Sequence, residues 1–488
     1  MAAQEVEKAE ARGTVGIERG INAGAVGMVM GIVQEQQYQK PTESTVRELT
    51  ANAVDSQSEK DRAFEIIRDG VSPDKYFVKR EGALYSDSHW SPDYYNLASL
   101  NEKENNVELT YKRGEGGGRC DTFIVKDHGV GIGGTRLEGV LEIGYSTKRN
   151  RKDALGAFGI GAKVGLATGA DYYTITSVYN GIKHIIKVFA RKSNSLVGAL
   201  NLDTGKPNIA HTFSTGEVIY GEATDELNYT TIAVPVMKHR RGDYIRAVET
   251  QLLYFHNVKF FLEDEDGDSY EHNFKADLLH NSPNLVISSN SPYSKPHIVI
   301  VKGGEGADTS TGVCYGHVDF AEMELQDMSG DIGIKCPIRQ VITDEDGTET
   351  VISEGVDVIA SREAVRWSTN TREFLKKQFA VAQDEASHLI EKELAQTDFV
   401  KWLEACTNIA MISSRSNTAI GRLSKIVNIS DMKPRFNKSK IQFDNVSGLF
   451  NGFKVVQNTK FLDKADGKYK VSRDTANGWN DVKLGAFY

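Results

Sequence analysis

The chain has 488 residues and a formal net charge of −9, with 40% hydrophobic and 26% charged residues. This length predicts two or three domains with substantial cores, and the composition is that of an ordinary globular protein. The four cysteines show no CxxC spacing, which argues against a disulfide framework or a zinc site. No apolar run of bilayer length and no signal-peptide pattern occurs, so we expect a cytoplasmic protein without a membrane span.

The first segment that suggests chemistry is Thr45–Asp55, TVRELTANAVD. On a helix, Glu48, Asn52 and Asp55 are four and three residues apart and share one face, while apolar residues on another side can pack on a sheet. The helix would thus present carboxylates and an amide to a cleft. The alternative is a capping box, in which Thr45 and Glu48 only close the start of the helix.

Residues 61–106 form a long connection that is rich in tyrosine, phenylalanine and tryptophan. Loops of this length are usually functional or disordered, and the aromatic content disfavours disorder. The segment is predicted to be either a binding surface or a flap that covers the core.

Alternating patterns at 107–112 and 122–126, with a glycine-rich stretch between them, predict a hairpin. The second strand ends on Asp127 and leads into the turn Asp127-His128-Gly129-Val130-Gly131. Glycines here allow backbone N–H groups to approach a phosphate, and a carboxylate at a strand end can accept a hydrogen bond from a base amino group.

A second glycine cluster, Gly156-Ala157-Phe158-Gly159-Ile160-Gly161, leads into a helical pattern. The N-terminus of that helix would add a favourable field for an anion. Lys148, between the two clusters, either reaches a phosphate or is a solvated surface lysine. The two clusters and Asp127 together indicate a nucleotide site. Strands are then predicted at 172–178, 183–190 and 230–236.

In this order, ELxxNAxD, DxGxG and GxFGxG resemble the GHKL superfamily of ATPases, which includes the gyrase B subunit, MutL, the ninety-kilodalton heat-shock chaperones and the sensor histidine kinases. The resemblance covers roughly residues 20–240. It implies that Glu48 is the general base that activates water, that Asn52 holds Mg²⁺ and that Asp127 reads the adenine amino group of ATP. It also implies a threonine near the phosphates, at Thr230, although Tyr229 stands where the family usually has glycine. It further implies that Gly129, Gly131, Gly156, Gly159 and Gly161 shape the nucleotide pocket and its lid. Asp55, Lys148, Phe158 and Ile160 are further candidate nucleotide-binding residues.

The sequence pattern over residues 241–400 predicts a separate α/β unit. Its expected elements are strands at 258–262 and 297–301 and a long helix after Trp367. Ser361-Arg362-Glu363 before that helix resembles the middle domain of the heat-shock chaperones. In GHKL ATPases such a transducer domain supplies a cation to the γ-phosphate, which implies this role for Arg362. Arginine suits the role because it stays charged and can hold two oxygens. The alternatives are an ion pair of Arg362 with an acid, and Arg366 as the cation.

The C-terminal segment differs in charge from the rest of the chain. From residue 401 to 488 there are 15 Lys and Arg residues against 7 Asp and Glu residues, a net charge of +8, so residues 1–400 carry −17. Basic residues interleaved with aromatic ones suit nucleic acid. They also suit docking on the acidic body of the same protein.

The sequence therefore predicts an α/β protein in three parts. Residues 1–240 are expected to form a GHKL ATP-binding domain, a Bergerat-type α/β sandwich. Residues 241–400 are expected to form a transducer-like α/β domain resembling the ribosomal S5 fold, and residues 401–488 a small basic C-terminal domain.

The resemblance implies Mg²⁺-dependent ATP hydrolysis that drives lid closure or ATP-dependent homodimerisation. The RELxxNAxDS helix and the SRE sequence are most similar to phage ATPases of the rapid-lysis A type, which implies a host or phage protein partner in the host cytoplasm. One alternative is a DNA-acting ATPase similar to MutL or gyrase B, favoured by the basic segment. Another is a chaperone-like ATPase. A histidine kinase is disfavoured because no phospho-acceptor histidine pattern precedes the ATPase segment.

Overall fold

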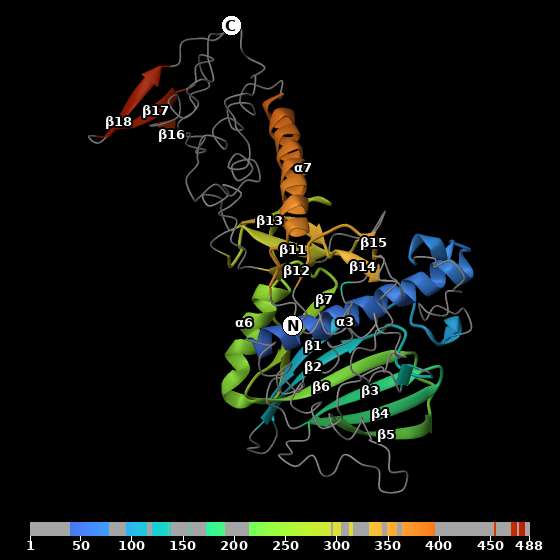
Figure 1. Ribbon diagram of the computed structural model, residues 1–488. Helices are drawn as coiled ribbons and strands as arrows, with labels where there is room; N and C mark the ends of the chain where they lie inside the picture. The colour runs from blue at the N-terminus through green and yellow to red at the C-terminus, as the bar shows by residue number, and fades with distance from the viewer. Residues whose placement is uncertain are drawn as a thin grey trace, which may run out of the picture.

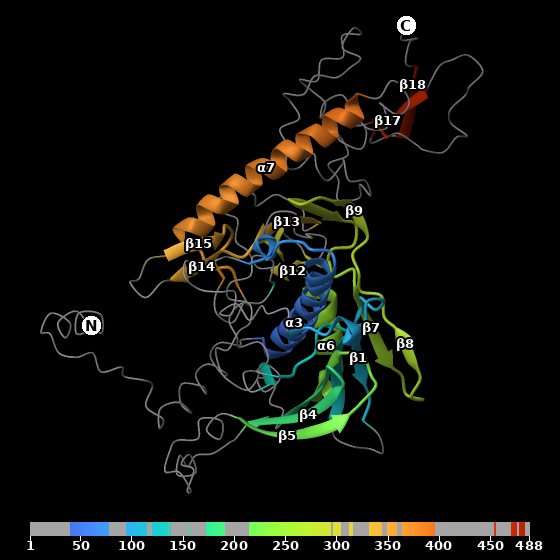
Figure 2. The same ribbon diagram turned by 90° about the vertical axis from the view of Figure 1, so that its right-hand side faces the viewer.

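The computed structural model describes residues 40–77, 94–114, 120–134, 136–137, 155, 172–190, 214–293, 296–303, 312–315, 331–343, 349–358, 364–395, 453–454, 470–475 and 478–483. These residues form a mixed α/β structure in which helices pack on two main sheets (Figures 1 and 2). The predicted α/β class is confirmed.

The first sheet has eight strands in the order β5-β4-β3-β6-β2-β1-β7-β8. Its neighbours pair antiparallel, except that β1 and β7 are parallel. The strands are β1 (Val107–Lys112), β2 (Cys120–Asp127), β3 (Tyr172–Tyr179), β4 (Ile182–Ala190), β5 (Ser214–Ala223), β6 (Tyr229–Met237), β7 (Val258–Glu263) and β8 (Ser269–Glu271). The predicted hairpin at β1 and β2 and the predicted strands β3, β4 and β6 are confirmed.

The predicted strand over 258–262 exists, but it does not belong to the second unit. It is β7, and its residues pair in parallel with β1, from Val107 opposite Val258 to Tyr111 opposite Leu262. The two strands alternate in the same way, with every second side chain buried, so pairing aligns their apolar positions on one face. The first sheet therefore continues past residue 240, as far as Glu271.

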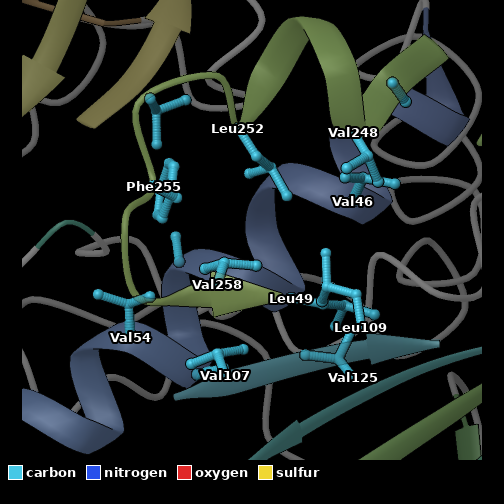
Figure 3. Packing of buried hydrophobic residues seen from close by; sticks show 14 of the residues in the cluster. Val46, Leu49, Val54, Val107, Leu109, Val125, Val248, Leu252, Phe255 and Val258 are labelled. Carbon is cyan, nitrogen blue, oxygen red and sulfur yellow. The ribbon is translucent and has the colours of Figure 1, made fainter. Parts of the chain in front are cut away.

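Helices α3 (Pro41–Ala63) and α6 (Arg241–Gln251) cover one face of this sheet. Figure 3 shows α3 lying between the strands below it and the α6 segment above it. Three sets of fully or almost fully buried side chains meet there. Helix α3 contributes Val46, Leu49 and Val54, and the strands contribute Val107, Leu109, Val125 and Val258. The α6 segment, which is α6 and the turn after it, contributes Val248, Leu252 and Phe255. Burying a side chain of this size contributes about 1.5–3 kcal/mol, so α3 is held by packing on both sides.

Short helical segments complete this part of the chain. The π-helix η1 (Phe64–Arg68) prolongs α3, and the 3-10 turns η2 (Pro73–Lys75) and η5 (Leu97–Ser99) follow within the aromatic-rich connection. The 3-10 turn η9 (Lys238–Arg240) joins β6 to α6.

The second sheet has the order β12-β11-β13-β10-β9 and includes the predicted strand at 297–301 as β11. Its strands are β9 (Leu278–Asn281), β10 (Leu285–Ser288), β11 (His297–Val301), β12 (Gly312–Tyr315) and β13 (Ile332–Pro337). A separate hairpin pairs β14 (Gln340–Thr343) with β15 (Glu349–Ser353). Near the C-terminus, β16 (Phe453–Lys454), β17 (Lys470–Thr475) and β18 (Gly478–Lys483) form a small antiparallel sheet.

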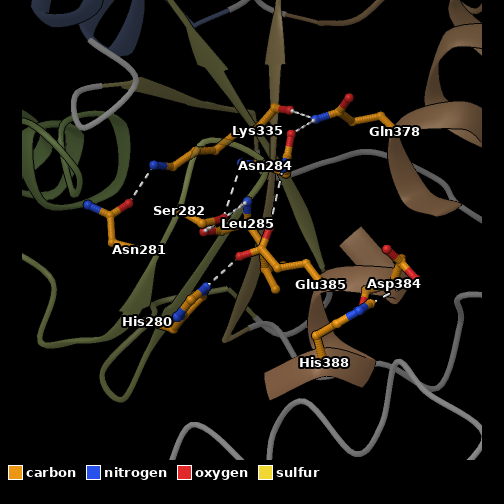
Figure 4. Close-up of polar contacts among 10 residues, drawn as sticks. All are labelled: His280, Asn281, Ser282, Asn284, Leu285, Lys335, Gln378, Asp384, Glu385 and His388. Atoms are coloured by element: carbon orange, nitrogen blue, oxygen red, sulfur yellow. Dashed lines mark hydrogen bonds and ion pairs between the residues drawn. The ribbon is translucent and has the colours of Figure 1, made fainter. Parts of the chain in front are cut away.

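The predicted long helix is α7 (Thr369–Leu394), which starts on the second sheet and projects away from it (Figure 1). Ser368 Oγ accepts the N–H of Thr371 at 3.1 Å, which satisfies one free donor of the first turn. Further along, Gln378 Nε2 donates to Lys335 O at 2.9 Å, and Glu385 accepts a hydrogen bond from His280 Nε2 at 2.8 Å (Figure 4). These polar contacts fix α7 on β13 and β9.

The two sheets share one apolar core. Buried residues of the second sheet, including Ile298, Ile300 and Ile334, belong to the same cluster as Val46 and Leu49 of α3. The core of the second sheet is therefore continuous with the core around the helix that carries the predicted catalytic residues.

Candidate nucleotide site

Helix α3 holds three predicted site residues at one-turn spacing. Glu48 and Asp55 are buried, with 5% and 0% of their surface exposed, and Asn52 between them is half-buried. Arg47 Nε lies 3.6 Å from Glu48 Oε1. The guanidinium of Arg47 in turn donates to Gln251 Oε1 of α6 at 3.1 Å. The carboxylate of Glu48 thus lies beside a cation that α6 helps to hold.

The capping-box alternative for Glu48 is wrong. Helix α3 begins at Pro41, with Lys40 as the N-cap residue and no side-chain cap bond. Proline is suited to the first helical position because its missing N–H would have no helical partner there. Thr45 consequently lies inside the helix, so Glu48 is not needed to close the helix start.

The first glycine turn packs directly against α3. Asp127 ends β2 with 5% of its surface exposed, and its Oδ1 accepts the N–H of Gly129 at 2.9 Å. A Cβ at Gly129 would lie 2.1 Å from Ser56 Oγ and 2.6 Å from the Ser56 carbonyl carbon, so the close approach requires glycine. Since Ser56 follows Asp55 and is one turn from Asn52, this contact brings the DxGxG and ELxxNAxD motifs together.

The other side of the turn packs against β3. Gly131 has a φ of +77°, and a Cβ there would lie 2.2 Å from Val178 O. One residue later, the N–H of Ile132 donates to Ser177 Oγ at 2.7 Å. The glycine turn is therefore packed between α3 and β3.

Thr230 reaches the site through the register of the sheet. It lies directly opposite Asp127 in the β2–β6 pair and opposite Ser177 in the β3–β6 pair. Thr230 is 5% exposed, and its Oγ1 is 3.2 Å from Ser177 Oγ. Thr230 is thus beside the carboxylate that the sequence assigns to the adenine, whereas the resemblance implied a position near the phosphates.

Two polar residues of the site were not predicted. Ser177, fully buried, pairs across β3–β4 with His184, which is 6% exposed. Together with Thr230 and Asp127 they form a row across four adjacent strands, which we term the inward polar row. Strand alternation was the only signal for them in the sequence, because their proximity depends on which strands pair.

Asp55 contacts the segment that the sequence predicts to be a lid. Its Oδ1 accepts the N–H of Leu155 at 2.9 Å, and Leu155 directly precedes Gly156. Helix α3 therefore also holds Leu155, the residue just before the second glycine cluster. The other predicted site residues of that segment lie outside the described residues, and their roles stay predictions: Lys148, Gly156, Phe158, Gly159, Ile160 and Gly161.

The described part of the aromatic-rich connection is a packed cover. Phe77 and Tyr95 are 4% and 8% exposed and belong to a small apolar cluster that includes Val130 of the glycine turn. This packing favours the covering-flap interpretation for these aromatic residues. Tyr85 and Trp90 lie outside the described residues.

A buried ion pair joins this cover to α3 and to the segment after the glycine turn. Arg136 Nη1 lies 2.6 Å from Glu59 Oε1, and both side chains are at least nine-tenths buried. The guanidinium also donates to the Tyr95 hydroxyl at 3.1 Å and lies 4.2 Å from the centre of the Tyr94 ring. The Tyr94 hydroxyl donates to Gly133 O at 3.1 Å. Burial raises the pKa of both tyrosines, so these hydroxyls remain donors.

Lys60 holds the end of the same connection. Its buried ammonium donates to Asn101 O at 2.8 Å, to Glu104 O at 2.6 Å and to Asn105 Oδ1 at 2.8 Å. Burial lowers the pKa of Lys60, and the three acceptors offset the cost of removing this cation from water.

The cation predicted for the second unit, Arg362, lies outside the described residues. Its alternative Arg366 is exposed, and its backbone N–H donates to Asp357 O at 2.8 Å. A different cation of the second unit reaches α3: Lys302, just after β11, whose Nζ donates to Ser58 Oγ. Ser58 is ten residues beyond Glu48, about 15 Å along the helix.

Residues 39–213 match the family model described as histidine kinase-, DNA gyrase B- and HSP90-like ATPase. This part of the chain therefore has the signature of a GHKL-type ATPase domain, which agrees with the resemblance carried by the three motifs. A search of curated proteins found no match to the chain. The matched range ends just before β5 and does not include Thr230, which is linked to the site by the sheet register and by its contact with Ser177.

None of the helices in the described ranges has the length and apolar character needed to cross a membrane. Within those same ranges, no group of three or more His, Cys, Asp or Glu side chains is arranged to hold a metal ion. A Mg²⁺ ion bound mainly by nucleotide phosphates does not require such a group, since this ion often uses only one or two protein ligands.

Proposed function

We propose that the chain is a Mg²⁺-dependent ATP hydrolase whose nucleotide lies between α3 and the ends of β2 and β6. The observation that carries this proposal is the contact of Gly129 with Ser56, because it sets Asp127 against the helix that bears Glu48 and Asn52. Ser56 is eight residues from Glu48, about 12 Å along the helix axis. That separation suits an extended nucleoside triphosphate with its base at Asp127 and its terminal phosphate at Glu48.

Each of the three side chains then has a distinct task. The Asp127 carboxylate accepts a hydrogen bond from the adenine amino group. Asn52 would hold Mg²⁺ together with phosphate oxygens, and the ion would neutralise charge on the phosphates. Glu48, which lies beside Arg47, accepts a proton from the water that attacks the γ-phosphate.

Replacing Glu48 by glutamine tests the catalytic assignment. Glu48→Gln keeps the size of the side chain but removes the base, so Mg²⁺-dependent ATP binding is expected to persist while hydrolysis falls about 10²–10⁴-fold. Binding is measured by calorimetry and hydrolysis by phosphate release. The matched control is Glu43→Gln, a partly exposed carboxylate on the same helix. Hydrolysis by Glu48→Gln at the wild-type rate would exclude the catalytic role of Glu48.

We further propose that ATP drives a cycle of closure. The hydrogen bond from the N–H of Leu155 to Asp55 ties α3 to the residue before the second glycine cluster and supports the proposal of a lid that responds to the nucleotide. Arg362 would complete the closed state from the second unit, and closure would favour an ATP-dependent homodimer. The resemblance of the α3 motif and of the SRE sequence to phage rapid-lysis A ATPases supports a phage or host protein as the partner of this cycle.

A second candidate uses the same ATPase to act on DNA. The charge of +8 over residues 401–488 favours it, because cationic residues interleaved with aromatic ones bind nucleic-acid backbones and bases. It differs from the first candidate in requiring DNA binding by the full chain that weakens as salt rises.

A further inference from the structure

In the inward polar row, the buried hydroxyl of Ser177 determines which groups donate hydrogen bonds and which accept them. Ser177 Oγ donates to Tyr229 O at 3.0 Å, accepts the N–H of Ile132 at 2.7 Å, and lies 3.2 Å from Thr230 Oγ1. A serine hydroxyl has one proton and two lone pairs. Because a carbonyl oxygen can only accept, the proton of Ser177 is used on Tyr229 O.

The remaining contact must therefore run from Thr230 to Ser177. The two lone pairs of Ser177 Oγ take the N–H of Ile132 and the hydroxyl proton of Thr230. As a result, Thr230 Oγ1 faces its other neighbours as an acceptor. Its cross-strand neighbour Asp127 is also an acceptor when ionised.

Two acceptors side by side select for a ligand group that carries two donors. The exocyclic amino group of a 6-aminopurine has two N–H bonds, whereas the oxygen of a 6-oxopurine has none. A buried polar site that cannot pair its groups rejects such an analogue more strongly than an apolar pocket does.

We propose that Ser177 is a specificity-determining positioning residue: by accepting a hydrogen bond from the Thr230 hydroxyl, it makes the Asp127–Thr230 pair an acceptor-only site that selects ATP over triphosphates of 6-oxopurines. This inference rests on the proposed ATPase function and adds to it the reason for base selection. Ser177 acts through Thr230 and does not itself need to touch the nucleotide.

The test compares ATP with inosine triphosphate, which differs by its 6-oxo group and N1 proton. In the full chain, Ser177→Ala frees the Thr230 hydroxyl to donate. The ratio of kcat/KM for ATP over inosine triphosphate is expected to fall about 3- to 10-fold, the value of one neutral hydrogen bond, with the change in KM and not in kcat. The matched control is Thr176→Ala, which removes a hydroxyl from the adjacent residue of β3 on the opposite face and should leave the ratio unchanged.

If Ser177→Ala does not fold, a second variant, Thr230→Val, tests the same role in base selection. Thr230→Val keeps the shape of the side chain and removes the acceptor, so it is expected to lower the ratio by a similar factor. The double variant should lose no more than either single one, because both act on the same oxygen.

The outcomes separate the two proposals. If the wild-type chain binds neither nucleotide, the proposed ATPase function fails. If it hydrolyses ATP and inosine triphosphate equally well, or if folded Ser177→Ala and Thr230→Val both keep the wild-type ratio, the role of Ser177 is overturned while the ATPase function stands.

Discussion

Burial sets the chemistry of two histidines near the candidate site. His184 lies in the inward polar row, and burial lowers its pKa from the ordinary value of 6.5. His128, in the glycine turn, has its pKa lowered by burial and, to a smaller extent, by Lys126. Both imidazoles are therefore neutral at pH 7, and neither adds a charge beside Asp127.

His184 is expected to make the fold less stable on mild acidification. The unfolded chain takes up this proton more readily than the folded one, so the free energy of unfolding falls as pH drops below 6.5. His184→Gln should make stability less dependent on pH between about 7 and 5, measured by chemical denaturation. The matched control is His239→Gln, at an exposed position after β6. If the free energy of unfolding depends on pH in the same way for His184→Gln and the wild type, this account is contradicted.

At the level of elements, the contact between the glycine turn and α3 is the tightest junction of the site. Gly129→Ala would place a methyl group against both the side chain and the backbone of Ser56, so relief requires the turn to move. Overpacking of this kind costs about 1–3 kcal/mol. We expect a lower thermal midpoint and weaker ATP binding by calorimetry.

Two further variants sharpen this prediction. Ser56→Gly should not rescue Gly129→Ala, because the Ser56 carbonyl carbon alone would lie 2.6 Å from the new methyl group. Gly242→Ala is the matched control, since nothing lies within 4 Å of a Cβ at that helical position, and alanine there should be neutral or stabilising. Wild-type ATP affinity in Gly129→Ala would show that the turn does not shape the site.

Local patterns predicted the elements of the site better than their mutual placement. The spacing of Glu48, Asn52 and Asp55 and the alternation of β1 and β2 depend on neighbouring residues, and both the helix and the hairpin are present. The placement of Thr230 beside Asp127 depends on β6 pairing with β2, which no local pattern specifies. Likewise, the ion pair of Arg136 with Glu59 joins segments far apart in sequence, so charge patterning did not indicate it.

At the scale of the whole molecule, the domain boundary predicted after residue 240 lies within a packed core. The α6 segment and β7 contribute five fully buried apolar side chains to the core shared with α3: Val248, Leu252, Phe255, Val258 and Phe260. By burial alone these side chains contribute roughly 8–15 kcal/mol, an upper estimate. This amount is comparable to the whole stability of a typical domain.

A fragment that ends at residue 240 is therefore expected not to fold. A fragment of residues 1–277, which includes α6, β7 and β8, should unfold cooperatively, whereas 1–240 should show no cooperative transition by circular dichroism and should aggregate on size-exclusion chromatography. If 1–240 unfolds at the same temperature as 1–277, the first sheet does not need its last two strands.

The parallel pairing of β1 with β7 has a consequence for synthesis of the protein. Val107 and Val258 are neighbours in the sheet, but about 150 residues of chain separate them. At translation rates of about 5–20 residues per second, β1 leaves the ribosome roughly 8–30 s before its partner. Throughout that interval one edge of β1 is open, and an open edge can pair with a strand of another nascent chain. Slow codons between the two strands would lengthen this exposure, and chaperones that bind nascent chains would be needed most at that stage.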